Sequence, residues 1–389
     1  MPLNRVASAL ALALALAACS APDAPEITSS QDTASPSSDT PTGPPVPGSE
    51  WDRTAPADAG FDPDALARLD RRFGSQRTNC FAVVRDGELV HFTTFDGEAP
   101  DAMGPAFSVT KSFTSVLVGI AADQGLLDLD DRAARYIPAW RDTPAGAVTI
   151  RDLLANVSGR HWDVETDYQE MALQARDKTA FAVGLSQDAA PGTVWHYNNA
   201  AIQTLEAVLS AATGEEPAEY ARQHLLRPLQ MSRTYWGTDR AGNTTTYAGV
   251  NASCLDLARF GLMMMRDGAW GDQQIVSADY VEEATGGSSS DLNAAYGLLW
   301  WVNRKGTVLG ALPATGAEEP GTGGATRPAA RRLAPQAPRD AFWALGLGKQ
   351  IVAVIPSEGI VAVRMGTTPD DPDALSPDDF TSAVLDAQR

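Results

Sequence analysis

The pattern of hydrophobic and polar positions predicts strands near both ends of the chain. Apolar residues recur on one helical face over 62–73, after an Asp62-Pro63 start, and this predicts a helix. Two apolar runs, 80–84 and 89–94, flank Asp86-Gly87, which is a favoured tight-turn pair. The pattern therefore predicts one helix followed by a hairpin in this part of the chain.

The middle of the chain is patterned as helix. Between about 105 and 265 apolar residues recur every three to four positions, most clearly over 200–212 and 256–265, and Thr149 precedes a short helical segment. Near the other end, 377–387 predicts a closing helix. Before it, three apolar runs predict a meander of strands: 341–347, 350–355 and 359–365.

Strands from both ends of the chain have to complete one sheet. The pattern thus predicts an α+β fold, in which helices from the two ends flank an antiparallel sheet and a large, mostly helical lobe is inserted beside a cleft. We assign 51–104 and 266–389 to the sheet lobe and 105–265 to the helical lobe. Within the sheet lobe, 305–338 is rich in Gly, Ala and Pro without periodicity and predicts a flexible loop.

The first residues predict export. Residues 1–18 join a short charged start to an apolar Ala/Leu run that is too short to span a bilayer, as in a signal peptide. Leu16-Ala17-Ala18-Cys19 resembles a bacterial lipobox, which implies lipidation of Cys19; an ordinary cleaved signal is the alternative. Residues 19–50, rich in Ser, Thr and Pro, predict a disordered tether. We expect a lipid anchor in a bacterial membrane, on the periplasmic face of the outer membrane in a cell with two membranes.

Composition narrows the partners. The net charge of −19, without a basic stripe, argues against nucleic acid. The four histidines are scattered and no metal-ligand spacing occurs, so we expect no metal ion and no cofactor. Apart from Cys19, the chain has Cys80 and Cys254, which in an oxidising compartment either pair or remain two buried thiols; the sequence leaves both open.

The first candidate catalytic motif is Ser108-Val109-Thr110-Lys111, which lies at the start of an apolar segment with helical periodicity. Residues three apart on a helix share one face, about one turn apart. A serine hydroxyl is a poor nucleophile until a base removes its proton, and the Lys111 amine can do so once burial lowers its pKa. Of the four lysines, only Lys111 has a serine three positions before it. The alternative is a serine near a helix start beside a solvated lysine.

Tyr197-Asn198-Asn199 is the second motif and the chain's only Tyr-x-Asn. It lies between a Pro191-Gly192 turn and the helix over 200–212, where a loop can project a phenol into a cleft. We expect the charge of Lys111 to lower the pKa of Tyr197, which could then act as a base or proton relay. The Asn199 amide can hold a substrate carbonyl or orient the lysine. A turn with a buried aromatic residue is the alternative.

A third motif, Ala344-Leu345-Gly346-Leu347-Gly348, ends the run over 341–347. Glycines inside a strand often mark the close approach of a backbone or a ligand. An edge strand here could offer one backbone N–H to an oxyanion, and Ser108 at its helix start could offer a second. A hairpin that tolerates glycines is the alternative.

Together the three motifs resemble the β-lactamase-related serine hydrolases, which include penicillin-binding proteins, class C β-lactamases, related esterases and nylon-oligomer hydrolases. The resemblance covers about residues 55–388 and implies a β-lactamase/transpeptidase-like fold. It implies the following roles: Ser108 as the acylated nucleophile, Lys111 as its base or activator, Tyr197 as relay base, Asn199 as polar support, and Gly346, Leu347 and Gly348 at the oxyanion, with the N–H from Leu347.

One departure from the family pattern bears on the substrate. The family's β-lactamases and peptidases carry Lys-Thr-Gly or His-Thr-Gly where this chain has Ala344-Leu345-Gly346, so a cation that would meet a substrate carboxylate is missing; Lys349 either replaces it or faces away. We expect an acyl-enzyme formed on a small amide or ester, as in the esterase-like and nylon-oligomer-hydrolase branch. Two alternatives stay open: a D,D-peptidase or β-lactamase, and a non-catalytic cell-envelope binding lipoprotein of the same fold.

Overall fold

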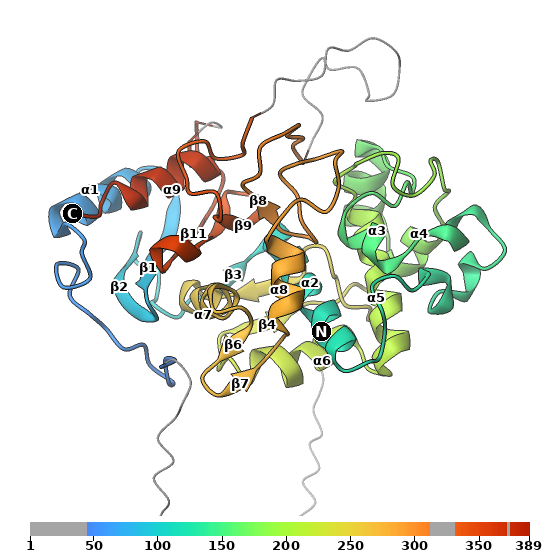
Figure 1. Cartoon of the computed structure of the whole chain (residues 1–389), viewed down its shortest axis with the longest axis horizontal. Coiled ribbons are helices and arrows are strands. Elements are labelled where there is room, and N and C mark those ends of the chain that lie inside the picture. The colour runs from blue at the N-terminus through green and yellow to red at the C-terminus, as the bar shows by residue number, and fades with distance from the viewer. Residues whose placement is uncertain (1–44, 312–330, 372–373) are drawn as a thin grey trace, which may run out of the picture. The chain divides into compact units, whose positions relative to one another are not determined.

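A six-stranded antiparallel sheet is the main element of the computed structural model, which describes residues 45–311, 331–371 and 374–389 (Figure 1). Its strand order is β2-β1-β11-β10-β9-β8. The strands are β1 (Thr78–Arg85), β2 (Glu88–Thr94), β8 (Trp301–Val302), β9 (Phe342–Gly346), β10 (Gln350–Ile355) and β11 (Ile360–Gly366). The predicted signal peptide, Cys19 and part of the 305–338 loop lie outside the described residues.

The two ends of the chain meet at the centre of this sheet. β1 pairs with β11 in antiparallel register, for example Val83 with Ala362, and this confirms that both ends build one sheet. The turn at Asp86-Gly87 has positive φ at both residues, as a tight hairpin between right-twisted strands requires. Because helices cover both faces, β10 is buried at every position instead of alternating.

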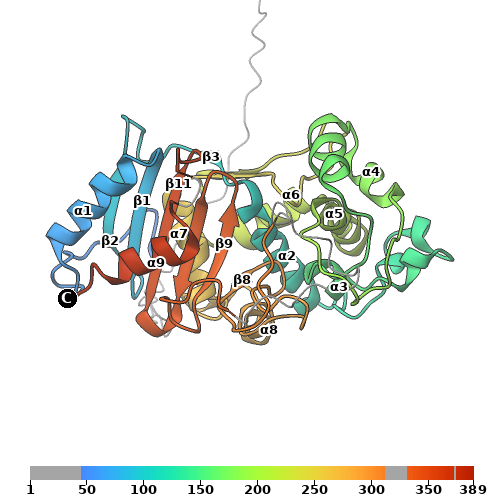
Figure 2. The ribbon, with the colours of Figure 1, turned by 90° about the horizontal axis from the view of Figure 1, so that it is seen from above.

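Helices from the two chain ends cover one face of the sheet, as predicted. α1 (Pro63–Gly74) begins where the Asp62 side chain accepts a hydrogen bond from the Asp64 backbone, and it lies beside α9 (Pro377–Leu385) (Figure 2). The other face is covered by α7 (Cys254–Met265). A Cβ at Gly261 would lie 2.6 Å from a Val361 methyl, so a glycine is needed for this close approach.

The position of α7 differs from the sequence-based division, which assigned it to the helical lobe over 105–265. α7 contacts β1, β10 and β11. Nearly all of its side chains are buried, so the helix has no polar face whose direction could have shown which neighbour it covers.

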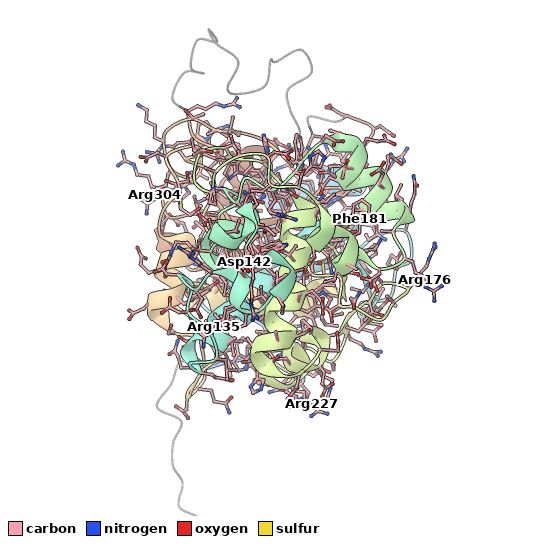
Figure 3. All side chains as sticks on the ribbon, turned by 90° about the vertical axis from the view of Figure 1, so that its right-hand side faces the viewer. Arg135, Asp142, Arg176, Phe181, Arg227 and Arg304 are labelled. Atoms are coloured by element: carbon pink, nitrogen blue, oxygen red, sulfur yellow. A yellow bond between two sulfur atoms is a disulfide. The ribbon has the colours of Figure 1, made fainter. Side chains whose placement is uncertain are left out.

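The inserted segment forms a helical layer beside β9. Its centre is α2 (Thr110–Asp123), buried over almost its whole length between β9 and α5 (Asn199–Thr213). Three shorter helices of this segment accompany them: α3 (Ile150–Leu154), α4 (Lys178–Gly184) and α6 (Pro217–Ala221). After the segment, α8 (Ala278–Thr285) places Tyr280 against α2 at Gly119. Figure 3 looks onto the outer end of this layer, where the exposed side chains of Arg176 and Arg227 lie at the periphery.

Six short strands were not predicted: β8 at the edge of the main sheet, and five outside that sheet. β3 (Gly104–Pro105), β5 (Val250–Ala252) and β4 (Thr234–Trp236) form a small sheet, and β6 (Ala269–Trp270) pairs with β7 (Gln273–Gln274). Strands of two or three residues are too short to show an alternating pattern.

Among the described residues, no helix is long and apolar enough to cross a bilayer.

Residues 45–50, which the sequence predicts as the end of the disordered tether over 19–50, belong to the folded unit, and 19–44 lie outside the described residues. Arg259 of α7 donates hydrogen bonds to the backbone carbonyls of Gly48, at 2.7 Å, and Ser49, at 3.3 Å. Arg266 donates to the carbonyl of Pro45 at 2.6 Å. Composition alone gave no reason for order here, because the donors come from a helix more than 200 residues away.

Cys80 in β1 and Cys254 in α7 form a disulfide, one of the two outcomes that the sequence left open. The bond joins residues 174 positions apart and ties α7 to the sheet that it covers.

We expect the double variant Cys80→Ser/Cys254→Ser to lose about 2–5 kcal/mol of unfolding free energy, because the cross-link closes a long loop and restricts the unfolded chain. Urea unfolding with and without a reductant measures the loss. The reductant should destabilise the wild-type protein and leave the variant unchanged. A wild-type protein that is indifferent to reductant and no more stable than the variant would contradict the cross-link.

Candidate active site

Ser108 lies in a short 3₁₀ turn, Phe107–Val109, which runs directly into α2 and contacts β9. The first N–H groups of a helix have no carbonyl partner within it, so the Ser108 N–H is available to a ligand. Phe107 has φ of 49°, a conformation that is rare for a bulky residue and costs backbone free energy. The backbone is thus held in an unusual shape just before the candidate nucleophile.

Lys111 meets Ser108 as the spacing predicted. Its Nζ lies 2.9 Å from Ser108 Oγ and donates a hydrogen bond to the Tyr247 backbone carbonyl, also at 2.9 Å. The side chain is 1% exposed, and this burial lowers the pKa of Lys111 to about 7, against the opposing charge of Asp167. At neutral pH a large share of this amine is therefore uncharged and able to accept a proton from the serine.

Tyr197 completes the predicted trio, with its ring centroid 4.6 Å from Lys111 Nζ. The expectation that Lys111 lowers the pKa of Tyr197 is wrong. Burial raises the pKa of Tyr197 above its usual range, and a hydrogen bond with Ser108 only partly opposes this. The reason is that a buried phenolate loses its hydration, while a lysine with a pKa near 7 offers only part of a positive charge. Tyr197 therefore keeps its proton and can donate it.

An aromatic cluster that the sequence analysis did not identify fixes the Tyr197 ring. Trp301 stacks on it with centroids 5.7 Å apart, and Tyr296 meets it edge-on at 6.0 Å. Trp195 packs edge-on against both Tyr296 and Trp301. All four side chains are buried. Two of these residues follow the motif by about 100 positions, so only the folded chain reveals the cluster.

The Asn199 side chain binds a buried carboxylate. Its side-chain amide donates to the Asp167 carboxylate at 2.7 Å, and the residue is 3% exposed. The Asn199 and Ala200 backbone N–H groups donate to the same carboxylate at 3.2 and 2.7 Å. Asp167 thus binds the first N–H groups of α5, which favour an anion. The polar support expected of Asn199 acts through this carboxylate.

Asp167 was missed by the sequence analysis. It lies on a π-helical segment, Glu165–Gln174, and is 1% exposed. Burial raises the pKa of Asp167, whereas the Asn199 and Ala200 N–H groups and the charge of Lys111 lower it. The segment has no clear apolar periodicity and lies about 30 residues before the Tyr-x-Asn motif, so no local signal marks it.

We expect Asp167→Asn to move the acid limb of the pH–rate profile below pH 7. The carboxylate stabilises the charged form of Lys111, so its removal lowers the pKa of the lysine further. Lost hydrogen bonds to α5 should also cost about 1–3 kcal/mol of stability. The matched control is Asp163→Asn on the preceding turn, which should leave the limb in place. A limb that stays at its position in Asp167→Asn, or moves upward, would contradict this role.

The third motif lies beside the serine turn. A Cβ on Gly346 would lie 2.4 Å from the Ala106 carbonyl oxygen, so only glycine allows this approach of β9. Leu347 is 68% exposed, and Gly348 and Lys349, with φ of 78° and 62°, turn the chain toward β10. The oxyanion role of the Leu347 N–H remains a prediction.

Arg364 of β11 holds this turn from inside the protein. Its guanidinium is fully buried and donates to the backbone carbonyls of Gly348 and, at 3.0 Å, Lys349. It also donates to the carbonyls of Arg77 and Thr367, at 2.9 and 3.1 Å. The position of Leu347 is therefore determined by a residue of another strand.

Within the described ranges no group of three or more His, Cys, Asp or Glu side chains is arranged to hold a metal ion. The chemistry that the site can perform rests on the hydroxyl, the amine and the phenol.

A serine beside a buried lysine is the site of a serine hydrolase. An antiparallel sheet with an inserted helical layer is the β-lactamase/transpeptidase-like fold. Residues 66–385 match the protein family described as Beta-lactamase. The chain belongs to this family.

Relatives agree with this assignment. The chain is 26% identical over 301 residues to the "6-aminohexanoate-dimer hydrolase" of Paenarthrobacter ureafaciens, covering 67% of this chain and 75% of that protein. It is 23% identical over 332 residues to an Escherichia coli K12 protein named "Putative D-alanyl-D-alanine carboxypeptidase", covering 66% and 76%. The solved structure named "Putative 6-aminohexanoate-dimer hydrolase from Bacillus anthracis" superposes with a TM-score of 0.67 at 21% identity, covering 87% and 86%, and shares the fold.

Proposed function

We propose that this serine hydrolase cleaves a small amide or ester through an acyl-enzyme on Ser108. The observation that carries the proposal is the 2.9 Å contact between Ser108 Oγ and the Nζ of a fully buried lysine whose pKa is about 7. A general base acts best when its pKa is close to the working pH, and here the base already touches the nucleophile.

Acylation follows from the three side chains. The Lys111 amine takes the Ser108 proton as Oγ attacks the substrate carbonyl, and the N–H groups of Ser108 and Leu347 receive the oxyanion. Tyr197, which keeps its proton, donates to the leaving amine or alkoxide and is reprotonated from Lys111. A water then attacks the ester on Ser108 with the same groups in reverse, which releases the acid and restores the serine.

An uncharged amide or ester fits the site better than a substrate with a carboxylate at the third motif. Ala344 and Leu345 offer no cation there. The Paenarthrobacter relative is named a 6-aminohexanoate-dimer hydrolase, and such a dimer is joined by an amide, so the name supports the reaction type and not the absence of charge. The name of the Escherichia coli relative makes a D,D-peptidase the competing outcome of the test.

A small substrate panel tests the proposal. Wild-type protein and Ser108→Ala are assayed on p-nitrophenyl acetate and butyrate, a linear aminohexanoate dimer, nitrocefin and a muropeptide ending in D-alanine. We expect Ser108-dependent cleavage of esters or the linear amide, with little turnover of nitrocefin. Release of D-alanine or rapid nitrocefin cleavage would favour a D,D-peptidase or β-lactamase. Absence of turnover of every compound would favour the non-catalytic binding lipoprotein.

We also propose that the mature protein is exported and anchored by a lipid on Cys19. Leu16-Ala17-Ala18-Cys19 and the polar stretch that follows support this. Mass spectrometry of protein from a bacterial host should find a diacylglyceryl-modified Cys19 at the N-terminus, and Cys19→Ala should lose the lipid. An unmodified mature N-terminus would contradict the anchor.

A further inference from the structure

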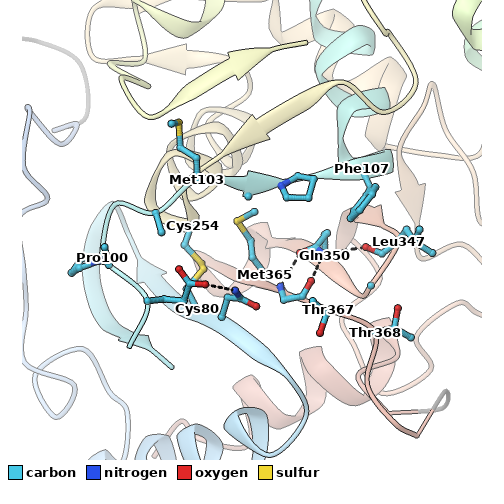
Figure 4. Close-up of a pocket in the computed structure, with 18 residues that line it drawn as sticks. Cys80, Pro100, Met103, Phe107, Cys254, Leu347, Gln350, Met365, Thr367 and Thr368 are labelled. Atoms are coloured by element: carbon cyan, nitrogen blue, oxygen red, sulfur yellow. Dashed lines mark hydrogen bonds between the residues drawn. A yellow bond between two sulfur atoms is a disulfide. The ribbon is translucent and has the colours of Figure 1, made fainter. Parts of the chain in front are cut away.

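A cavity of about 260 Å³ lies beside the serine turn, between the end of β9 and the segment before β3 (Figure 4). Much of its lining is apolar or sulfur-containing: Met103, Pro105, Phe107, Leu347, Met365 and the Cys80–Cys254 disulfide. Lys111 and Tyr197 do not line it. The proposed mechanism assigns this cavity no role.

Two side chains at this cavity are exposed to an unusual degree. Met103 is 48% exposed and Leu347 is 68% exposed, and they are two of the five large hydrophobic side chains that are exposed in the described part of the chain. Apolar side chains gathered at the mouth of a pocket mark a binding site more often than an isolated one does. A ligand with an apolar group would shield both from water.

Ser108 does not line the cavity, but two residues that do are next to groups of the proposed mechanism. Phe107 directly precedes Ser108, and Leu347 carries the N–H that the proposed mechanism uses for the oxyanion. A substrate whose carbonyl is bound at Ser108 therefore has this cavity within reach of its chain.

We propose that the cavity binds the apolar acyl chain of the substrate; this inference rests on the proposed acyl-enzyme function. The leaving group has to receive its proton from Tyr197, so it lies on the side of Tyr197 and Lys111. The acyl chain extends to the other side, past Phe107 and Leu347. An apolar cavity of about 150 Å³ accepts benzene, so this one has room for a medium-length alkyl chain or an aryl group.

The charges at the cavity define the chain further. Its lining includes Glu98, whose carboxylate accepts a hydrogen bond from Asn79 at 2.9 Å, and includes no lysine or arginine. An anionic chain end would be repelled without a compensating cation. The acyl group therefore ends in an uncharged or cationic group.

p-Nitrophenyl esters with acyl chains from acetate to decanoate test the inference, because only the acyl side changes. We expect kcat/KM to rise about two- to fourfold per methylene until the cavity is filled, as expected for a buried CH₂. Ala102→Phe, which fills the cavity, should lower the ratio of octanoate to acetate turnover at least tenfold. The matched control Ala57→Phe, at an exposed turn residue that does not line the cavity, should keep the wild-type ratio.

Two further arms keep the test decisive. Met103→Ala shortens an exposed side chain, with little risk to folding, and should lower the same ratio about threefold; Leu173→Ala, at another exposed hydrophobic residue, is its control. The mono-p-nitrophenyl ester of adipate, which ends in a carboxylate, should be at least tenfold poorer than the hexanoate ester. Glu98→Gln should narrow that difference.

The outcomes separate this inference from the function on which it rests. If turnover depends on Ser108 but kcat/KM does not change with acyl chain length, the acyl cavity alone is overturned. The same follows if the cavity variants and their controls change the ratio of octanoate to acetate turnover equally. Cleavage of the linear amide without turnover of any ester likewise overturns the acyl cavity alone, whereas absence of Ser108-dependent turnover of every ester and of the linear amide overturns the proposed function and this inference with it.

Discussion

Ser108→Ala is expected to lower kcat by about 10⁴- to 10⁶-fold on every substrate that the wild-type protein hydrolyses, as removal of a nucleophile does in other serine hydrolases. Lys111 and Tyr197 both contact Ser108, so without its hydroxyl the amine has no proton to accept and no acyl-enzyme forms. Steady-state kinetics on p-nitrophenyl butyrate measure the loss, with the thermal melt as a check of folding.

A matched control lies one turn along the same helix. Ser112 is buried in α2, and its hydroxyl donates to the Leu299 backbone carbonyl at 2.9 Å without contacting Lys111 or Tyr197. Ser112→Ala should cost about 1 kcal/mol of stability and keep most of the activity. A Ser108→Ala protein with wild-type rates, or equal losses in the two variants, would contradict Ser108 as the nucleophile.

Lys111→Met is expected to lower kcat/KM by about 10³- to 10⁵-fold, because the serine loses both its base and the charge that orients it. The same change should stabilise the fold by about 1–3 kcal/mol near neutral pH, since a methionine of similar length needs no hydration. Lys305→Met, at an exposed lysine, is the control and should change neither property.

The pKa of Lys111 determines how the stability gain from Lys111→Met changes with pH. The pKa of Lys111 is about 7 in the folded protein, against 10.5 for an ordinary lysine, so between these values the unfolded chain binds more protons. The burial of Lys111 therefore lowers the free energy of unfolding most below pH 7. This destabilisation becomes smaller as the pH rises from 7 to 10.5. The gain from Lys111→Met should be largest at pH 6 and should shrink by pH 9.

Urea unfolding at pH 6 and pH 9 measures that gain, and the rate profile reports the same group. Wild-type kcat/KM should rise through an acid limb near pH 7, because the protonated amine cannot accept the serine proton. A gain that grows with pH, or a rate that falls through pH 7, would contradict Lys111 as the base.

Sequence patterns predicted most of the fold because their signals are local. The Asp86-Gly87 turn, the meander around β10 and the amphipathic α1 each follow from a few neighbouring residues. That strands from both ends of the chain share one sheet followed from counting the strands at each end, whereas the pairing of β1 with β11 is known only from the structure. The placement of α7 and the order of residues 45–50 could not be predicted in this way, since both depend on which distant surface the residues contact.

The catalytic side chains were predictable for a similar reason, and their surroundings were not. Ser108 and Lys111 share a helix face, whereas Asp167 and Trp301 come from segments far away in the chain. The pKa of Tyr197 shows the consequence. Charge alone suggested a lowered value, but the burial that raises it exists only in the folded protein.

An activated Ser108 can be tested by labelling the full-length protein with a fluorophosphonate and mapping the adduct by peptide mass spectrometry across a range of pH. We expect one adduct, on Ser108, absent from Ser108→Ala, with a labelling rate that rises through pH 7 as Lys111 loses its proton. No labelling, or an adduct on another residue that persists in Ser108→Ala, would contradict an activated serine at this site.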